Sequence, residues 1–75
     1  MADKVLDTKG LNCPLPILKA KKAMADVAAG GTLEVLATDP GSVPDFIAFC
    51  KTQKLELVEH SEAGGVYRFL IRRPA

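Results

Sequence analysis

The spacing of apolar residues along this chain alternates between two periods, and that alternation limits the possible folds more than any other feature. Two stretches, residues 14–29 and 42–53, have apolar residues at the helical spacing of three to four. The remaining apolar stretches are short, with a period near two or β-branched residues, as strands require. These strand stretches are residues 4–8, 32–38, 55–59 and 66–72. The sequence therefore predicts the order β-α-β-α-β-β.

Each predicted helix has one apolar face. In the first helix this face consists of Ile17, Ala20, Met24, Val27 and Ala28, opposite Lys19, Lys22 and Asp26. Gly30 and Gly31 then end the helix. In the second helix the apolar face consists of Val43, Phe46, Ile47 and Cys50. Ser42 followed by Asp45 resembles a capping box, which places Ser42 at the N-cap.

The predicted order of elements favours an α/β two-layer sandwich. Each strand–helix–strand unit favours a parallel strand pair with a right-handed crossover. A turn at residues 62–65 would make the last two strands an antiparallel hairpin, with Tyr67, Phe69 and Ile71 on one face. We expect a four-stranded mixed sheet with both helices on one face, because each helix has only one apolar stripe to bury.

Length and charge narrow the functional classes. A chain of 75 residues with 48% hydrophobic residues is enough for one compact domain. A formal net charge of +1 argues against a dedicated nucleic-acid binder. The charged N-terminal residues do not resemble an export signal, and no apolar run approaches the ~20 residues that span a bilayer. We therefore expect a cytoplasmic protein without a membrane partner.

The chain has two cysteines, Cys13 and Cys50, and one histidine, His60. These three residues cannot fill a four-ligand structural zinc site, so we expect no metal. Both cysteines are predicted to be free thiols. Cys50 falls on the apolar face of the second helix, where a thiol packs and does not react. A resolving role for Cys50 is the functional alternative, although no C-x-x-C spacing supports it. His60 is expected to be an ordinary strand residue.

Cys13 comes directly before a helix that begins with two prolines, Pro14 and Pro16. Prolines are tolerated there because the first N–H groups of a helix have no intrahelical acceptor. If Cys13 is the cap residue, its sulfur faces the N–H groups of Leu15 and Ile17 and the positive end of the helix dipole. We would then expect the pKa of the thiol to be lowered, which makes a better nucleophile. The alternative is that Cys13 is a small buried hydrophobe.

The residues around Cys13 resemble the Cys-Pro-x-Pro signature of the TusA-like (SirA-like) sulfur-carrier proteins. The matching residues are Gly10-Leu11-Asn12-Cys13-Pro14-Leu15-Pro16, followed by Leu18-Lys19-Ala20. Further similarity lies in the turn at residues 37–42, in Asp45-Phe46 and in Gly64-Gly65. The resemblance extends over residues 6–72 and would make residues 1–75 one such domain.

The resemblance implies a function for Cys13 as a persulfide carrier, with Asn12, Pro14 and Pro16 shaping its turn. Such proteins take sulfane sulfur from a cysteine desulfurase or a rhodanese-like donor and pass it to an acceptor protein. In the family, the sulfur serves tRNA thiolation, molybdenum-cofactor synthesis or sulfur oxidation. This sulfurtransferase-type transfer needs no cofactor, and the carrier is expected to be a monomer when free and not a small-molecule enzyme.

Two other functions are compatible with the sequence. The first is a thiol redox protein, which would need a resolving cysteine. The second is an interaction or RNA-binding module that uses basic residues, although only Tyr67 is a candidate for base stacking and we expect no direct nucleic-acid binding. Lys19, Lys21 and Lys22 follow the Cys13 turn. They form either a solvated face or a docking surface for acidic partners around the thiol.

Overall fold

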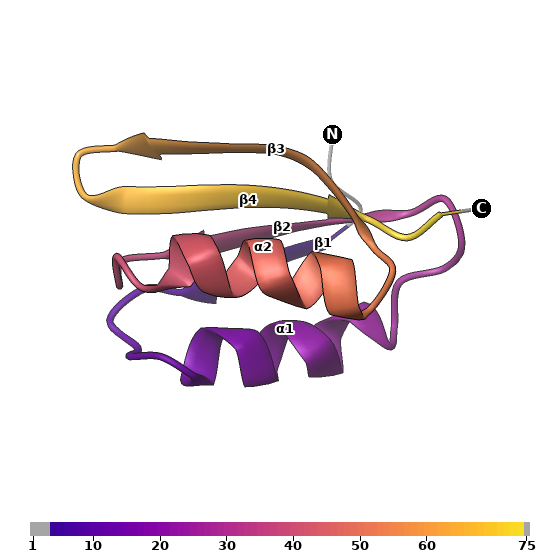
Figure 1. Cartoon of the computed structure of the whole chain (residues 1–75), viewed down its shortest axis with the longest axis horizontal. Coiled ribbons are helices and arrows are strands. Elements are labelled where there is room, and N and C mark those ends of the chain that lie inside the picture. The colour runs from indigo at the N-terminus through magenta and orange to yellow at the C-terminus, as the bar shows by residue number, and fades with distance from the viewer. Residues whose placement is uncertain (1–3, 75) are drawn as a thin grey trace.

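The computed structural model describes residues 4–74, which fold into a four-stranded sheet with two helices on one of its faces (Figure 1). The elements are β1 (Lys4–Thr8), α1 (Leu15–Met24), β2 (Thr32–Ala37), α2 (Ser42–Thr52), β3 (Glu56–Ala63) and β4 (Val66–Arg72). This order and the two layers confirm the predicted fold class. Both helices run in the same direction beneath the sheet, so their N-terminal ends lie at the same end of the molecule (Figure 1).

The strand order in the sheet is β1-β2-β4-β3. β1 pairs with β2 in parallel, as predicted for the first strand–helix–strand unit. The second unit differs, because β4 lies between β2 and β3 and is antiparallel to both. Parallel pairing of β2 with β3 was therefore the wrong expectation. The physical reason is burial, since β4 carries Phe69 and Ile71, which are fully buried, whereas β3 is mostly exposed and suits an edge.

The hairpin between β3 and β4 turns at Gly64 and Gly65, which both have positive φ angles. A turn of this kind favours glycine because it has no Cβ to clash. β3 extends to Ala63 and is thus longer than predicted. The additional residues 60–63 are polar or small and exposed, so hydrophobicity does not mark them, and pairing with β4 makes them a strand.

The core lies between the sheet and the two helices. Leu33, Val35 and Ala37 of β2 are fully buried, which confirms their predicted alternation. Phe46 of α2 stacks on Phe69 of β4, with ring centroids 4.6 Å apart. Burial of such aromatic rings is a large part of the stability of a small core.

The buried face of α2 differs from the prediction by a rotation about the helix axis. Ile47 was expected in the core but is 47% exposed, whereas Phe49 is only 7% exposed. Phe49 lines the hollow that α2 forms with α1. The second helix packs against two neighbours, the sheet and α1, so its buried stripe follows both contacts.

The first helix ends at Met24, earlier than the predicted residue 29. The N–H groups of residues 25–27 bond to carbonyls three positions back, which tightens the last turn. The Arg73 guanidinium donates to the carbonyls of Met24 and Val27, at 2.6 Å and 2.8 Å. Val27 is buried as predicted, but Ala28 is exposed and does not belong to the apolar face. The C-terminal segment thus caps α1, a long-range contact with no local signal.

No helix within residues 4–74 is long and apolar enough to cross a membrane.

Candidate functional site

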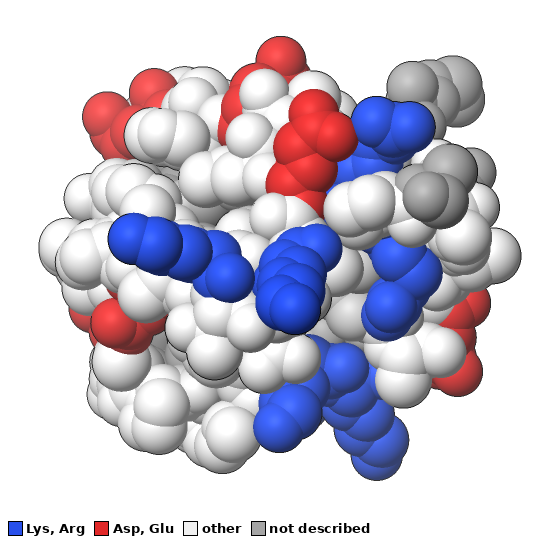
Figure 2. Space-filling model, turned by 45° about the vertical axis from the view of Figure 1, so that its right-hand side comes forward, with Lys and Arg blue, Asp and Glu red and all other residues white. Residues whose placement is uncertain are grey.

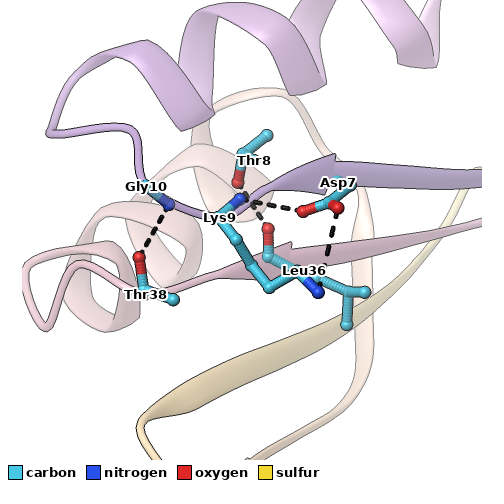
Figure 3. A network of polar contacts seen from close by, with 6 residues as sticks. All are labelled: Asp7, Thr8, Lys9, Gly10, Leu36 and Thr38. Carbon is cyan, nitrogen blue, oxygen red and sulfur yellow. Dashed lines mark hydrogen bonds and ion pairs between the residues drawn. The ribbon is translucent and has the colours of Figure 1, made fainter.

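The loop that leads from β1 to Cys13 is fixed to the end of β2 by a polar network (Figure 3). The Thr8 hydroxyl, fully buried, donates to the Leu36 carbonyl at 2.6 Å. The Gly10 N–H donates to the Thr38 hydroxyl at 2.9 Å, and Gly10 has a positive φ angle of 83°. The first bond joins β1 to β2, and the second joins the loop after β1 to the residue after β2. The sheet therefore determines where the next residues lie.

Cys13 ends that loop, and its peptide bond with Pro14 is cis. Pro14 is the N-cap of α1, so Leu15 is the first helical residue and Pro16 the second. The proposal that Cys13 is the cap residue is therefore wrong by one position. The Leu15 N–H donates to the Asn12 carbonyl at 2.9 Å, which closes the turn and takes up that donor. Pro16 is fully buried, so it packs in the core as well as starting the helix.

Asp39, in the turn after β2, holds the backbone of Cys13. One carboxylate oxygen accepts the Cys13 N–H at 2.7 Å, and the other accepts the Gly41 N–H at 3.1 Å. The sequence indicated a turn residue here, which the Gly41 contact confirms. The contact with Cys13, 26 positions away, is an addition that the sequence did not predict.

Asp45, in the first turn of α2, accepts a hydrogen bond from the Cys13 thiol. The predicted capping box is wrong, because Gly41 is the N-cap and α2 has no side-chain cap bond. Ser42 is buried, and its hydroxyl has no hydrogen-bond partner among the described residues. Asp45 thus contacts the sulfur of Cys13, which lies just before the start of α1. Asp45 is a site residue that the sequence did not predict.

The pKa of the Cys13 thiol is raised, which is the opposite of the expectation from the helix start. The main cause is the hydrogen bond to the Asp45 carboxylate, followed by desolvation and by the negative charges of Asp45 and Asp39. A carboxylate that accepts a thiol proton stabilises the neutral thiol. The sulfur makes this bond in place of the predicted contacts with the N–H groups of Leu15 and Ile17.

The two cysteines differ in accessibility as the sequence predicted. Cys13 is exposed, and both cysteines are free. Cys50 is only 3% exposed, and burial raises the pKa of its thiol to about 11. The description of Cys13 as a buried hydrophobe is therefore wrong, and Cys50 is a packing residue on the inner face of α2.

A shallow groove of about 310 Å³ begins at the Cys13 sulfur and runs between the two helices. Its walls are mainly apolar, and Asp45 lies at the end nearest the sulfur. The residues lining the groove are Cys13, Pro14, Ile17, Asp45, Ala48, Phe49, Thr52 and Gln53. A partner that reaches Cys13 therefore meets an apolar surface with carboxylates beside it.

The lysines of α1 do not surround the thiol. Lys21 and Lys22 lie in the last turn of the helix, about 9–10 Å along its axis from its first residue, Leu15. Lys and Arg side chains gather on the side of the molecule where both helices end, which comes forward in Figure 2. At that end they complement the helix dipole. Lys19 is exposed near the middle of α1, so a docking role for these lysines stays a prediction.

Within residues 4–74, no group of three or more His, Cys, Asp or Glu side chains is arranged to hold a metal ion. His60 is exposed on β3, as predicted. The site thus consists of one exposed thiol and two carboxylates. Asp45 accepts a hydrogen bond from the side chain of Cys13, and Asp39 accepts one from its backbone.

Comparisons of the sequence and of the structure with known proteins point to the same protein family. The family model described as "Sulfurtransferase TusA" matches residues 4–73. The chain is 55% identical to the sulfur carrier protein TusA of Allochromatium vinosum, covering 95% of this chain and 93% of that protein. It is 44% identical to the TusA protein of Pseudomonas aeruginosa, covering 97% and 92%. A crystal structure of a SirA-like protein from Desulfitobacterium hafniense superposes with a TM-score of 0.84 at 27% identity, covering 96% and 99%.

Proposed function

Because this chain belongs to the TusA family of sulfur carriers, we propose that Cys13 is the residue that carries the sulfur, as a persulfide. The observation that supports this choice is the exposure of the two thiols. Cys13 lies open at the end of a groove, whereas Cys50 is 3% exposed and packed among apolar side chains. A carried sulfur atom must be reached by both a donor and an acceptor, and only an exposed thiol allows that.

The proposed reaction is an exchange between a protein persulfide and the Cys13 thiol. The Cys13 sulfur forms a bond to the outer sulfur of the donor persulfide, and the sulfur–sulfur bond of the donor breaks. The donor leaves as a thiol, which receives the proton that Cys13 gives up. No net oxidation occurs, so the reaction needs no redox cofactor. The same exchange, with Cys13 as the donor, passes the sulfur to an acceptor cysteine on a second protein.

The donor that fits this site is a protein such as a cysteine desulfurase or a rhodanese-like sulfurtransferase, whose persulfide is displayed on a protein loop. The groove beside Cys13 is apolar and open, which suits a loop more than a small polar substrate. Asn12, Pro14 and Pro16 hold the turn that presents the sulfur. Two free thiols fit a reducing compartment, and we place the exchange in the cytoplasm.

The test is the mass of the protein after incubation with a cysteine desulfurase and cysteine. We expect a gain of one sulfur, about 32 Da, that mild reduction removes. Cys13→Ser should abolish the gain, and the matched variant Cys50→Ala should keep it. Sulfur bound to Cys50 would contradict the proposal, as would a Cys13–Cys50 disulfide as the main product. The disulfide would favour a thiol redox protein instead.

A further inference from the structure

Two carboxylates from later in the chain approach Cys13, and each binds a different part of the residue. Asp39 accepts its N–H at 2.7 Å, which orients the backbone. Asp45 accepts the thiol proton itself. A carrier that only needed a reactive thiolate would gain more from a cation at this position. Exposure alone therefore does not account for the state of Cys13, because Asp39 orients its backbone and Asp45 holds its thiol proton.

We propose that Asp45 is a positioning residue that holds Cys13 as an unreactive thiol in the free protein, until a cationic side chain of the donor pairs with the carboxylates. The inference rests on the proposed function of Cys13. Pairing of Asp45 with a lysine or arginine of the donor removes the acceptor that keeps the proton on sulfur. The thiolate then forms only in the complex with a donor. In the free protein, oxidants and electrophiles encounter the less reactive protonated thiol.

The charges around the sulfur support a cationic partner. The ionisable groups that act on Cys13 within residues 4–74 are Asp45, from α2, and Asp39, from the turn before α2. Among the lysines of α1, Lys21 and Lys22 lie in the last turn and Lys19 near the middle, so none is in the first turn beside these carboxylates. Beyond Asp45 the groove is mainly apolar, so an ion pair formed beneath a bound loop would be partly shielded from water.

The same carboxylates act differently on the loaded form. After transfer, the carbon-bound sulfur of Cys13 has no proton to donate, so its bond to Asp45 is lost. The terminal sulfur, when ionised, is repelled by the charges of Asp45 and Asp39. Repulsion favours a position away from α2 and toward solvent, where an acceptor can reach the sulfur.

The first test is the pH dependence of Cys13 alkylation by iodoacetamide in a Cys50→Ala background. We expect Asp45→Asn to move the midpoint of the rate profile to lower pH and to raise the rate at neutral pH severalfold. Asp26→Asn, a change in the exposed turn after α1, is the matched control and should leave the profile unchanged. Circular dichroism establishes that each variant is folded. An unchanged midpoint in folded Asp45→Asn would overturn the inference.

The second test compares two thiol reagents of similar size and opposite charge, a cationic and an anionic alkyl methanethiosulfonate. In the parent protein the cationic reagent should react faster with Cys13. Asp45→Asn should lower the ratio of the two rates by about fivefold, a value expected for removal of one charge at close range near water. Asp45→Glu should restore it to within about twofold of the parent. Equal ratios of the two rates in all variants would overturn the proposal that a cationic side chain of the donor pairs with Asp45.

Neither measurement uses a sulfur donor, so the two proposals fail separately. Absence of sulfur loading on Cys13 in the unmodified protein contradicts the proposed function, whatever the alkylation profiles show. Intact loading together with profiles that ignore Asp45 overturns only the role of Asp45.

Discussion

The turn before α1 and the inner face of α2 each hold one cysteine, and the pKa of both thiols is raised. At Cys13 the first cause is a hydrogen bond to the Asp45 carboxylate on an exposed surface. At Cys50 the cause is burial alone. A partner can remove the first cause by pairing with the carboxylate, whereas only unfolding removes the second. The same direction of pKa shift thus belongs to a thiol that can be switched on and to one that cannot.

The largest expected difference between the two regions is in labelling rate. In the folded protein at neutral pH, iodoacetamide should alkylate Cys13 at least about 100-fold faster than Cys50, because Cys50 reacts only after local opening of α2. Peptide mapping after brief labelling measures both rates. Comparable rates in a protein shown to be folded would remove the distinction between the two environments.

Replacing each thiol with a hydroxyl tests the same contrast through stability. Cys50→Ser should lower the free energy of unfolding by about 2 kcal/mol, because it places a hydroxyl among apolar side chains. Cys13→Ser should change it by less than about 0.5 kcal/mol, since the site is exposed and the serine hydroxyl can still donate to Asp45. Urea unfolding of both variants gives the values. An equal loss would mean that the Cys13 turn is as structural as the core.

The pH dependence of stability isolates the buried thiol. Its pKa is about 11 in the folded protein and about 9.0 when exposed, as in the unfolded chain. Below pH 9 the thiol is protonated in both states, so its contribution is fully present. Between pH 9 and pH 11 the unfolded state ionises first, and the parent should lose about 2 kcal/mol more than Cys50→Ala. Urea unfolding of the two proteins at about pH 8 and about pH 11 checks this, and equal losses would contradict it.

The smallest effect is expected from the far end of α1. Lys21→Glu and Lys22→Glu place negative charge at a helix C-terminus, which should cost about 0.5 kcal/mol each. The alkylation rate of Cys13 should stay within about twofold of the parent, because the charges lie about 9–10 Å along the helix axis from its first residue and are screened by salt. Thermal melts and labelling rates on the same variants measure both. A large change in the alkylation rate of Cys13 would mean that charges at the C-terminal end of α1 also influence the thiol.

Most elements of the fold follow from local patterns. Residues 4–8 and 66–72 were predicted with the bounds that β1 and β4 have. The alternation of Leu33, Val35 and Ala37 was sufficient because burial on one face imposes a period of two. The place of β4 between β2 and β3 was not predictable in the same way. It depends on which strand is apolar enough for the centre of the sheet, a comparison between strands that no single segment contains.

The site was predicted only in part for the same reason. Cys13 and its prolines form a continuous motif, so the sequence indicates them directly. Asp45 was interpreted as part of a cap for its own helix, because capping is the local role of an acidic residue in a first turn. Its actual partner is 32 positions away. The contact exists because α2 packs beside α1. It cannot be predicted from the sequence of either helix alone.

The central position of β4 has a consequence for how the protein is made. β4 supplies the middle of the sheet, and two of its side chains are fully buried in the core. On a translating ribosome, residues 66–72 leave the exit tunnel after every other strand and helix described here. Until then β2 and β3 have no shared partner, and their unpaired edges are exposed to other nascent chains. The core therefore closes late in synthesis, and slow emergence of β4 would prolong the period in which a chaperone is most useful.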